Sequence, residues 1–197
     1  MIPLKIYIQL LIRQMARRRR EPKGKKINPT LFVFCEGVTE EAYVNLLKSI
    51  YRIPSIQIRS KIGRNNITSE FIENFKKGKP THEKDMNFLM YDIDVPEIIE
   101  RLNGIDDSTL LLSNPCIELW FLLHYKNQTA NINSERCCRE MSNRNRGYNK
   151  GAIDRKLKEK LISKRKDAVN RAKALTENNN PSSSVYRLID ILDELKK

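Results

Sequence analysis

The sequence has few of the residues that bind zinc or form disulfides. It contains two histidines and four cysteines among 197 residues. Cys137 and Cys138 are adjacent and cannot form a low-strain bridge with each other, and no Cys-x-x-Cys spacing occurs. Neither His82 nor His124 has a His or Cys partner at ligand spacing. This pattern predicts that the cysteines are reduced structural thiols.

Long hydrophobic runs are also missing. The longest run near the start, residues 6–12, is too short to span a bilayer, and arginines follow it where a signal peptide would need small residues. We therefore expect a cytoplasmic protein that does not engage membranes. Met15 precedes four arginines closely and is a plausible alternative start, so residues 1–14 carry little weight.

Acidic residues are scarce relative to basic ones, 24 against 37, which gives a net charge of +13. Residues 1–26 carry +8 and residues 136–173 carry +10, so the rest of the chain is at −5. One basic run is usually a solvated helix face or a tail, but two runs around an acidic middle favour binding to a phosphate backbone. The expected nucleic-acid contacts are Arg17, Arg18, Arg19, Arg20, Lys61, Arg64, Arg144, Arg146 and Lys150.

Short apolar strands alternate with helices in the middle of the chain. The predicted strands are 30–35, 56–60, 86–91 and 108–113, and the predicted helices are 39–50, with Thr39 as N-cap, 68–77, a short one from Pro96, and 117–125. Strands separated by helices form a parallel sheet. The sequence therefore predicts an α/β fold with a Rossmannoid, mostly parallel sheet of about four strands and flanking helices.

The pattern changes beyond about residue 126. A polar stretch over 126–150 is followed by a charged helix over 152–176, a loop over 178–184 and an amphipathic helix over 185–195. We therefore divide the chain into a basic N-terminal arm (1–27), an α/β domain (28–126) and a helical, basic C-terminal extension (127–197). Lys61 and Arg64 are expected in the loop after the second strand.

Three acidic residues stand where predicted strands end. Glu36 follows strand 30–35, and Asp92 and Asp94 follow strand 86–91 two positions apart. The carboxyl ends of parallel strands meet at one edge of a sheet, where ligands bind. Carboxylate oxygens suit Mg²⁺ or Mn²⁺, which activate water and polarise phosphoryl groups. The three acids therefore predict a metal site for phosphodiester hydrolysis.

Four segments together resemble the RloB-like proteins of bacterial phage-defence and restriction loci. They are residues 34–43, 91–94, 113–125 and 180–186, of which Asn-Pro-Cys-Ile-Glu-Leu-Trp at 114–120 is the most specific. The resemblance covers roughly residues 15–197. It implies a Toprim-like fold related to OLD-type nucleases, metal-dependent nuclease activity in anti-phage defence, and an ABC-type ATPase encoded nearby as a regulatory partner.

The resemblance also implies roles for single residues. Glu36 matches the Toprim glutamate that binds metal or transfers a proton, and Asp92 and Asp94 match the metal-binding Asp-x-Asp pair. Glu40 matches a further acid, a candidate ligand for a second metal. Val95 stands where many family members carry another acid, and this difference favours one metal over two.

Two residues of the family signature have both a structural and a catalytic interpretation. Glu118 lies in the first turn of a predicted helix, where the helix dipole favours an acid. His124 lies six residues further along, on a different part of the helix surface, but histidine is the usual proton-transfer residue near neutral pH. The sequence leaves both interpretations open for each residue.

Two other functions compete with the nuclease. The Asp92-x-Asp94 pair also resembles the haloacid-dehalogenase-type phosphatases, but the further acidic pair they need is poorly matched by Asp106 and Asp107, which come too soon and in a turn. The stronger alternative is a non-catalytic, nucleic-acid-binding or regulatory subunit of a defence complex. The choice between DNA and RNA, and the formation of a homo-oligomer, remain open.

Overall fold

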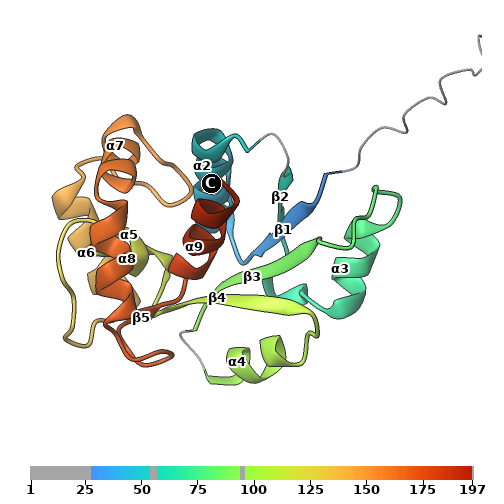
Figure 1. The fold of residues 1–197 in the computed structure, drawn as a ribbon. Helices are drawn as coiled ribbons and strands as arrows, with labels where there is room; N and C mark the ends of the chain where they lie inside the picture. Colours follow the sequence, from blue (N-terminus) through green and yellow to red (C-terminus); the bar gives the residue numbers. More distant parts are fainter. Residues whose placement is uncertain (1–27, 54–56, 94–95, 197) are drawn as a thin grey trace, which may run out of the picture.

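The fold is built on a five-stranded sheet with the strand order β2-β1-β3-β4-β5 (Figure 1). The computed structural model describes residues 28–53, 57–93 and 96–196. The parallel strands are β1 (Thr30–Cys35), β2 (Gln57–Ile62), β3 (Met86–Asp92) and β4 (Ser108–Asn114), and the antiparallel edge strand is β5 (Ser182–Ser183). The predicted α/β fold with a mostly parallel sheet is confirmed.

The interior strand β1, which lies between β2 and β3, is buried on both faces of the sheet. Its side chains alternate in direction, so that Leu31, Val33 and Cys35 enter one core and Phe32 and Phe34 enter the other. A strand covered on both faces reads as a continuous apolar run, as this one does. Glu36 directly follows it and is therefore held by a rigid element.

Helices cover both faces of the sheet. The larger core contains side chains from α2 (Val38–Tyr51), α5 (Ile117–Leu123), α6 (Ser134–Arg144), α7 (Arg155–Ser163), α8 (Arg165–Lys173) and α9 (Tyr186–Leu195). The smaller core lies under α3 (Ser69–Lys76) and α4 (Pro96–Asn103), and the short 3-10 helix η1 (Arg64–Asn66) precedes α3. The C-terminal helices thus share one core with the sheet (Figure 1).

The C-terminal part contains elements that differ from the prediction. The stretch over 126–150 includes α6, the single helix predicted over 152–176 is divided into α7 and α8 at Lys164, and the predicted loop over 178–184 contributes β5. Helix α6 is strongly polar and buries only Cys137 and Met141, so its apolar stripe is weak in the sequence. Strand β5 is followed by Ser184, whose hydroxyl accepts a hydrogen bond from the backbone N–H of Leu112 in β4. Such tertiary contacts leave no local pattern.

Two local predictions were wrong. Helix α2 begins at Val38 with Gly37 as N-cap, whereas Thr39 lies within its first turn. The Glu40 carboxylate accepts the backbone N–H of Gly37 at 3.0 Å and thereby replaces the predicted threonine cap. Lys61 belongs to β2 and not to a loop, because β2 pairs with β1 along its whole length. Within the described part of the chain, none of the helices combines the length and the apolar character needed to cross a bilayer.

Candidate active site

Four acidic side chains occur at the carboxyl-terminal edge of the parallel strands or on the helices that begin there. Glu36 follows β1 and Asp92 ends β3, and these two strands are neighbours in the sheet. Glu40 lies in the first turn of α2, and Glu118 lies in the first turn of α5. The strand order and the two following helices thus bring acids from four elements to one region.

Hydrogen bonds fix the two acids that follow the central strands. The Glu36 carboxylate accepts the backbone N–H of Asp92 at 2.9 Å. The backbone N–H of Glu36 in turn donates to the carbonyl oxygen of Met90 at 3.0 Å, which continues the pairing of β1 with β3. The position of Glu36 beside Asp92 is therefore set by the sheet itself.

The four acids act on one another electrostatically. Burial raises the pKa of Asp92 well above its usual range, and the charges of Glu40, Glu36 and Glu118 raise it further, while the backbone N–H of Ile117 acts in the opposite direction. Burial also raises the pKa of Glu40, with added repulsion from Glu36 and Glu118. Burial and mutual repulsion therefore disfavour the charged forms of Asp92 and Glu40, and a bound cation would offset that repulsion.

Two carboxylate oxygens of this cluster are buried without a hydrogen-bond partner in the described part of the chain: Asp92 Oδ1 and Glu118 Oε2. Buried polar atoms are nearly always paired, and an unpaired one within an acidic group suggests an ion that binds there. All donors of this group are hard carboxylate oxygens, the preferred ligands of Mg²⁺ and Mn²⁺. The donor type of this group therefore suits a hard divalent cation.

A loop from the C-terminal part completes the site. Within residues 145–151, the Tyr148 hydroxyl donates to Glu118 Oε1 at 2.7 Å, and Lys150 Nζ lies 3.9 Å from the same oxygen. Gly151, with φ of +80°, donates its backbone N–H to the Thr39 hydroxyl at 2.9 Å. This contact holds the loop against the start of α2, and the loop places the Tyr148 hydroxyl and the Lys150 ammonium group beside Glu118.

The structure does not bring His124 to the acids. Its side chain is 1% exposed, and Nδ1 lies 2.9 Å from the carbonyl oxygen of Trp120, which can only accept, so Nδ1 carries the proton. Burial lowers the pKa of His124 to about 4, and the charged groups that act on it are Arg171 and Lys160. His124 is therefore a neutral core residue among the C-terminal helices.

Five of the basic residues predicted to contact nucleic acid lie in the described part of the chain: Lys61, Arg64, Arg144, Arg146 and Lys150. Lys150 lies beside the acids, and Lys61 and Arg64 are exposed near the carboxyl end of β2, the strand next to β1. Arg144 and Arg146 are exposed at the end of α6 and just beyond it, and Arg144 pairs with a glutamate of the same helix at 3.5 Å. Lys150, Lys61 and Arg64 thus lie toward the edge of the sheet where the acids gather.

The run from Arg17 to Arg20 and the second acid of the pair, Asp94, lie outside the described residues. The residues that the sequence did not indicate are Tyr148, Cys116 and Cys138, of which Tyr148 contacts Glu118. The glycines at 147 and 151 mark a turn around Tyr148 and are the one local signal that could have pointed to this loop.

The comparisons with known proteins agree with the resemblance seen in the sequence. A family model described as RloB-like protein matches residues 31–192, which is most of the chain and includes all four clustered acids. The comparison with curated proteins and the comparison with solved structures each gave no match.

Proposed function

The chain belongs to the RloB-like family, and on this basis we propose that it is a metal-dependent nuclease that hydrolyses phosphodiester bonds of DNA or RNA in anti-phage defence. The observation that carries the proposal is the group of acids from four elements, in which a buried Asp92 oxygen has no hydrogen-bond partner among the described residues. Such an arrangement lowers the stability of the folded chain and is expected only where a cation compensates for it.

The proposed cofactor is Mg²⁺ or Mn²⁺, held by Glu36 and Asp92, with Glu40 as a further ligand and Asp94 as the second acid of the pair. When bound, such an ion polarises a phosphoryl oxygen and lowers the pKa of a coordinated water. The chain contributes the fixed positions of its carboxylates: the Asp92 N–H orients Glu36, and the Gly37 N–H orients Glu40. Because these donors are backbone groups of rigid elements, little reorganisation is needed on binding.

The proposed substrate follows from the charges around the acids. A group of carboxylates repels a polyanion, so nucleic acid needs cations beside the site in order to approach it. The exposed residues Lys61 and Arg64 and the site residue Lys150 supply them. Contacts of this kind read the phosphate backbone and give affinity without sequence preference. We also propose, from the family relationship, that an ABC-type ATPase regulates the activity.

The full-length chain, incubated with supercoiled plasmid and with tRNA, tests the proposal. We expect cleavage of at least one substrate with Mg²⁺ or Mn²⁺ and none with EDTA. Glu36→Gln keeps the size of the side chain but weakens its metal binding, and we expect the cleavage rate to fall by about 100-fold or more. Glu70→Gln, an exposed acid on α3, is the matched control and should cleave normally.

Cleavage that persists in EDTA, or that is unchanged in Glu36→Gln, would contradict the metal-dependent mechanism. An absence of cleavage by the wild-type chain, even with its ATPase partner added, would favour the non-catalytic, regulatory alternative. Binding of the same substrates without cleavage would then identify the chain as a nucleic-acid-binding subunit.

A further inference from the structure

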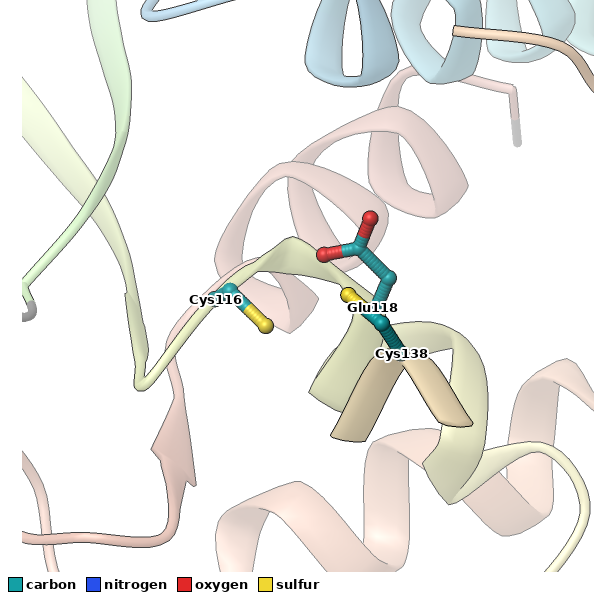
Figure 2. A group of neighbouring side chains, drawn as sticks. All are labelled: Cys116, Glu118 and Cys138. Atoms are coloured by element: carbon teal, nitrogen blue, oxygen red, sulfur yellow. The ribbon is translucent and has the colours of Figure 1, made fainter. Parts of the chain in front are cut away.

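A second group of potential metal ligands lies beside the acids and includes two thiols. Cys116 is the N-cap residue of α5, Glu118 lies in the first turn of that helix, and Cys138 lies on α6. One ligand atom from each residue falls within 4.8 Å of the other two. Figure 2 shows the three side chains close together, two from the start of one helix and one from its neighbour.

The spacing of these atoms suits a tetrahedral zinc ion. With Zn–S bonds of about 2.3 Å and a Zn–O bond of about 2.1 Å, tetrahedral ligand atoms lie roughly 3.6–3.8 Å apart. Atoms that already lie within 4.8 Å of one another therefore need to move by about 1 Å or less, which side-chain rotation supplies. Two sulfurs and one oxygen also favour zinc over magnesium, which prefers oxygen alone.

Burial provides a second, independent indication of a ligand. Glu118 is 1% exposed, and its Oε2 has no hydrogen-bond partner in the described residues, whereas Tyr148 and Lys150 occupy Oε1. Cys116 is 2% exposed, while Cys138 is only partly buried. The carboxylate thus has one free oxygen in a buried place, and the partly exposed thiol gives an ion a way in from solvent.

The charges around the group also suit a bound cation. Two thiolates and a carboxylate carry three negative charges, and a zinc ion neutralises two of them. Lys150, with its Nζ 3.9 Å from Glu118, supplies the remaining positive charge. The Lys150 side chain is 63% exposed and can adjust its position, so it need not compete with the ion.

We propose that Cys116, Glu118 and Cys138 bind a zinc ion, with water in the fourth position. Binding replaces the two thiol protons, which pass to the solvent. The ion would join the start of α5 to α6 and fix Glu118 beside the acid cluster. This site shares Glu118 with the acid cluster but differs from the proposed Mg²⁺ or Mn²⁺ site in its ligands, which are mainly sulfur, and it does not depend on nuclease activity.

Titration of the reduced, full-length chain with Co²⁺ tests the proposal by spectroscopy. One equivalent should produce a thiolate-to-cobalt charge-transfer band and the intense visible bands of tetrahedral cobalt, and one equivalent of Zn²⁺ should remove them. Cys138→Ser changes a partly exposed residue and should fold; we expect it to lose at least half of the charge-transfer intensity and to bind Zn²⁺ at least 10-fold more weakly.

Two control variants distinguish this site from the neighbouring thiol and from the acid cluster. Cys137→Ala removes the adjacent thiol, which points into the core, and Asp92→Asn changes the acid cluster; both should keep the cobalt bands. Circular dichroism checks that every variant is folded. The proposal is wrong if the reduced wild-type chain shows no charge-transfer band, if Cys138→Ser leaves the band unchanged, or if Cys116 and Cys138 form a disulfide and bind no metal.

Discussion

Asp92→Asn should make the metal-free protein more stable. The folded state raises the pKa of Asp92, mainly through burial and then through the neighbouring acids, so the folded protein binds this proton more tightly than the unfolded chain does. The stabilisation from that proton is complete below the unfolded pKa and is lost as the pH rises through the folded one. At pH 7.5 the unfolded chain carries Asp92 ionised, so folding requires this side chain either to take up a proton or to bury its charge. A neutral amide of the same shape avoids both costs.

The size of the effect follows from the charge that the substitution removes, because the amide stays buried and polar but is neutral. Burying a polar group without full compensation costs about 1–3 kcal/mol, and more for a charged one, so we expect a gain of this order, which for a chain of this length is a rise in Tm of roughly 3–9 °C. A saturating divalent cation should cancel or reverse this difference in stability, because a ligand at 100 times its Kd stabilises the wild type by about 2.7 kcal/mol. Asp92→Asn lacks one of the proposed metal ligands, so the cation should stabilise it only slightly.

Thermal unfolding followed by circular dichroism, first in EDTA and then with increasing MgCl₂, measures both effects. Asp106→Asn removes the same charge from an exposed position ahead of β4 and is the matched control. It should unfold like the wild type under every condition. If Asp92→Asn is less stable than the wild type in EDTA, or if Mg²⁺ stabilises both proteins equally, the cluster is not a strained cation site.

Three further changes test other parts of the structure. Gly151→Ala places a Cβ on a residue with φ of +80° and against the Val38 side chain. The free energy of unfolding, measured with urea, should therefore fall by about 1–2 kcal/mol. An unchanged urea midpoint would contradict the packing of this loop against α2. Tyr148→Phe removes the hydrogen bond from the Tyr148 hydroxyl to the buried Glu118 carboxylate. The free energy of unfolding should fall by about 1.5–3 kcal/mol. An unchanged free energy of unfolding would show that this hydrogen bond does not form. Because burial lowers the pKa of His124 to about 4, the folded protein loses stability as the pH falls from 7 to 5. His124→Gln should make this loss in the free energy of unfolding smaller by about 2 kcal/mol. An equal pH dependence in both proteins would show that His124 is exposed to solvent.

The strand-end acids could be predicted because their positions follow from local rules. An apolar run followed by an acid places Glu36 and Asp92 at the carboxyl ends of parallel strands whatever the order of those strands. Their hydrogen-bonded contact needed one more fact, that β1 and β3 are neighbours. The order of the strands is not encoded in any local pattern. The sequence therefore predicted that Glu36 and Asp92 lie at the same edge of the sheet, but not that they are in contact.

The rest of the site depends on packing between distant segments. From the sequence alone, Glu118 could equally well be an acid that only stabilises the start of its helix. The packing of α5 against the sheet buries it and brings its charge close enough to act on Asp92. Tyr148 and Cys138 come from a polar stretch whose single helix has a narrow apolar stripe. Their contacts with α5 are tertiary, and this is why spacing rules for cysteine ligands found no site.

Anomalous diffraction from a crystal soaked in Mn²⁺ would show most directly whether the clustered acids bind a hard divalent cation. We expect a manganese peak within coordination distance of carboxylate oxygens of Glu36 and Asp92, and no such peak in Asp92→Asn crystals. A wild-type crystal with no peak at these residues, or a peak that is equally strong in the variant, would contradict the proposed metal site.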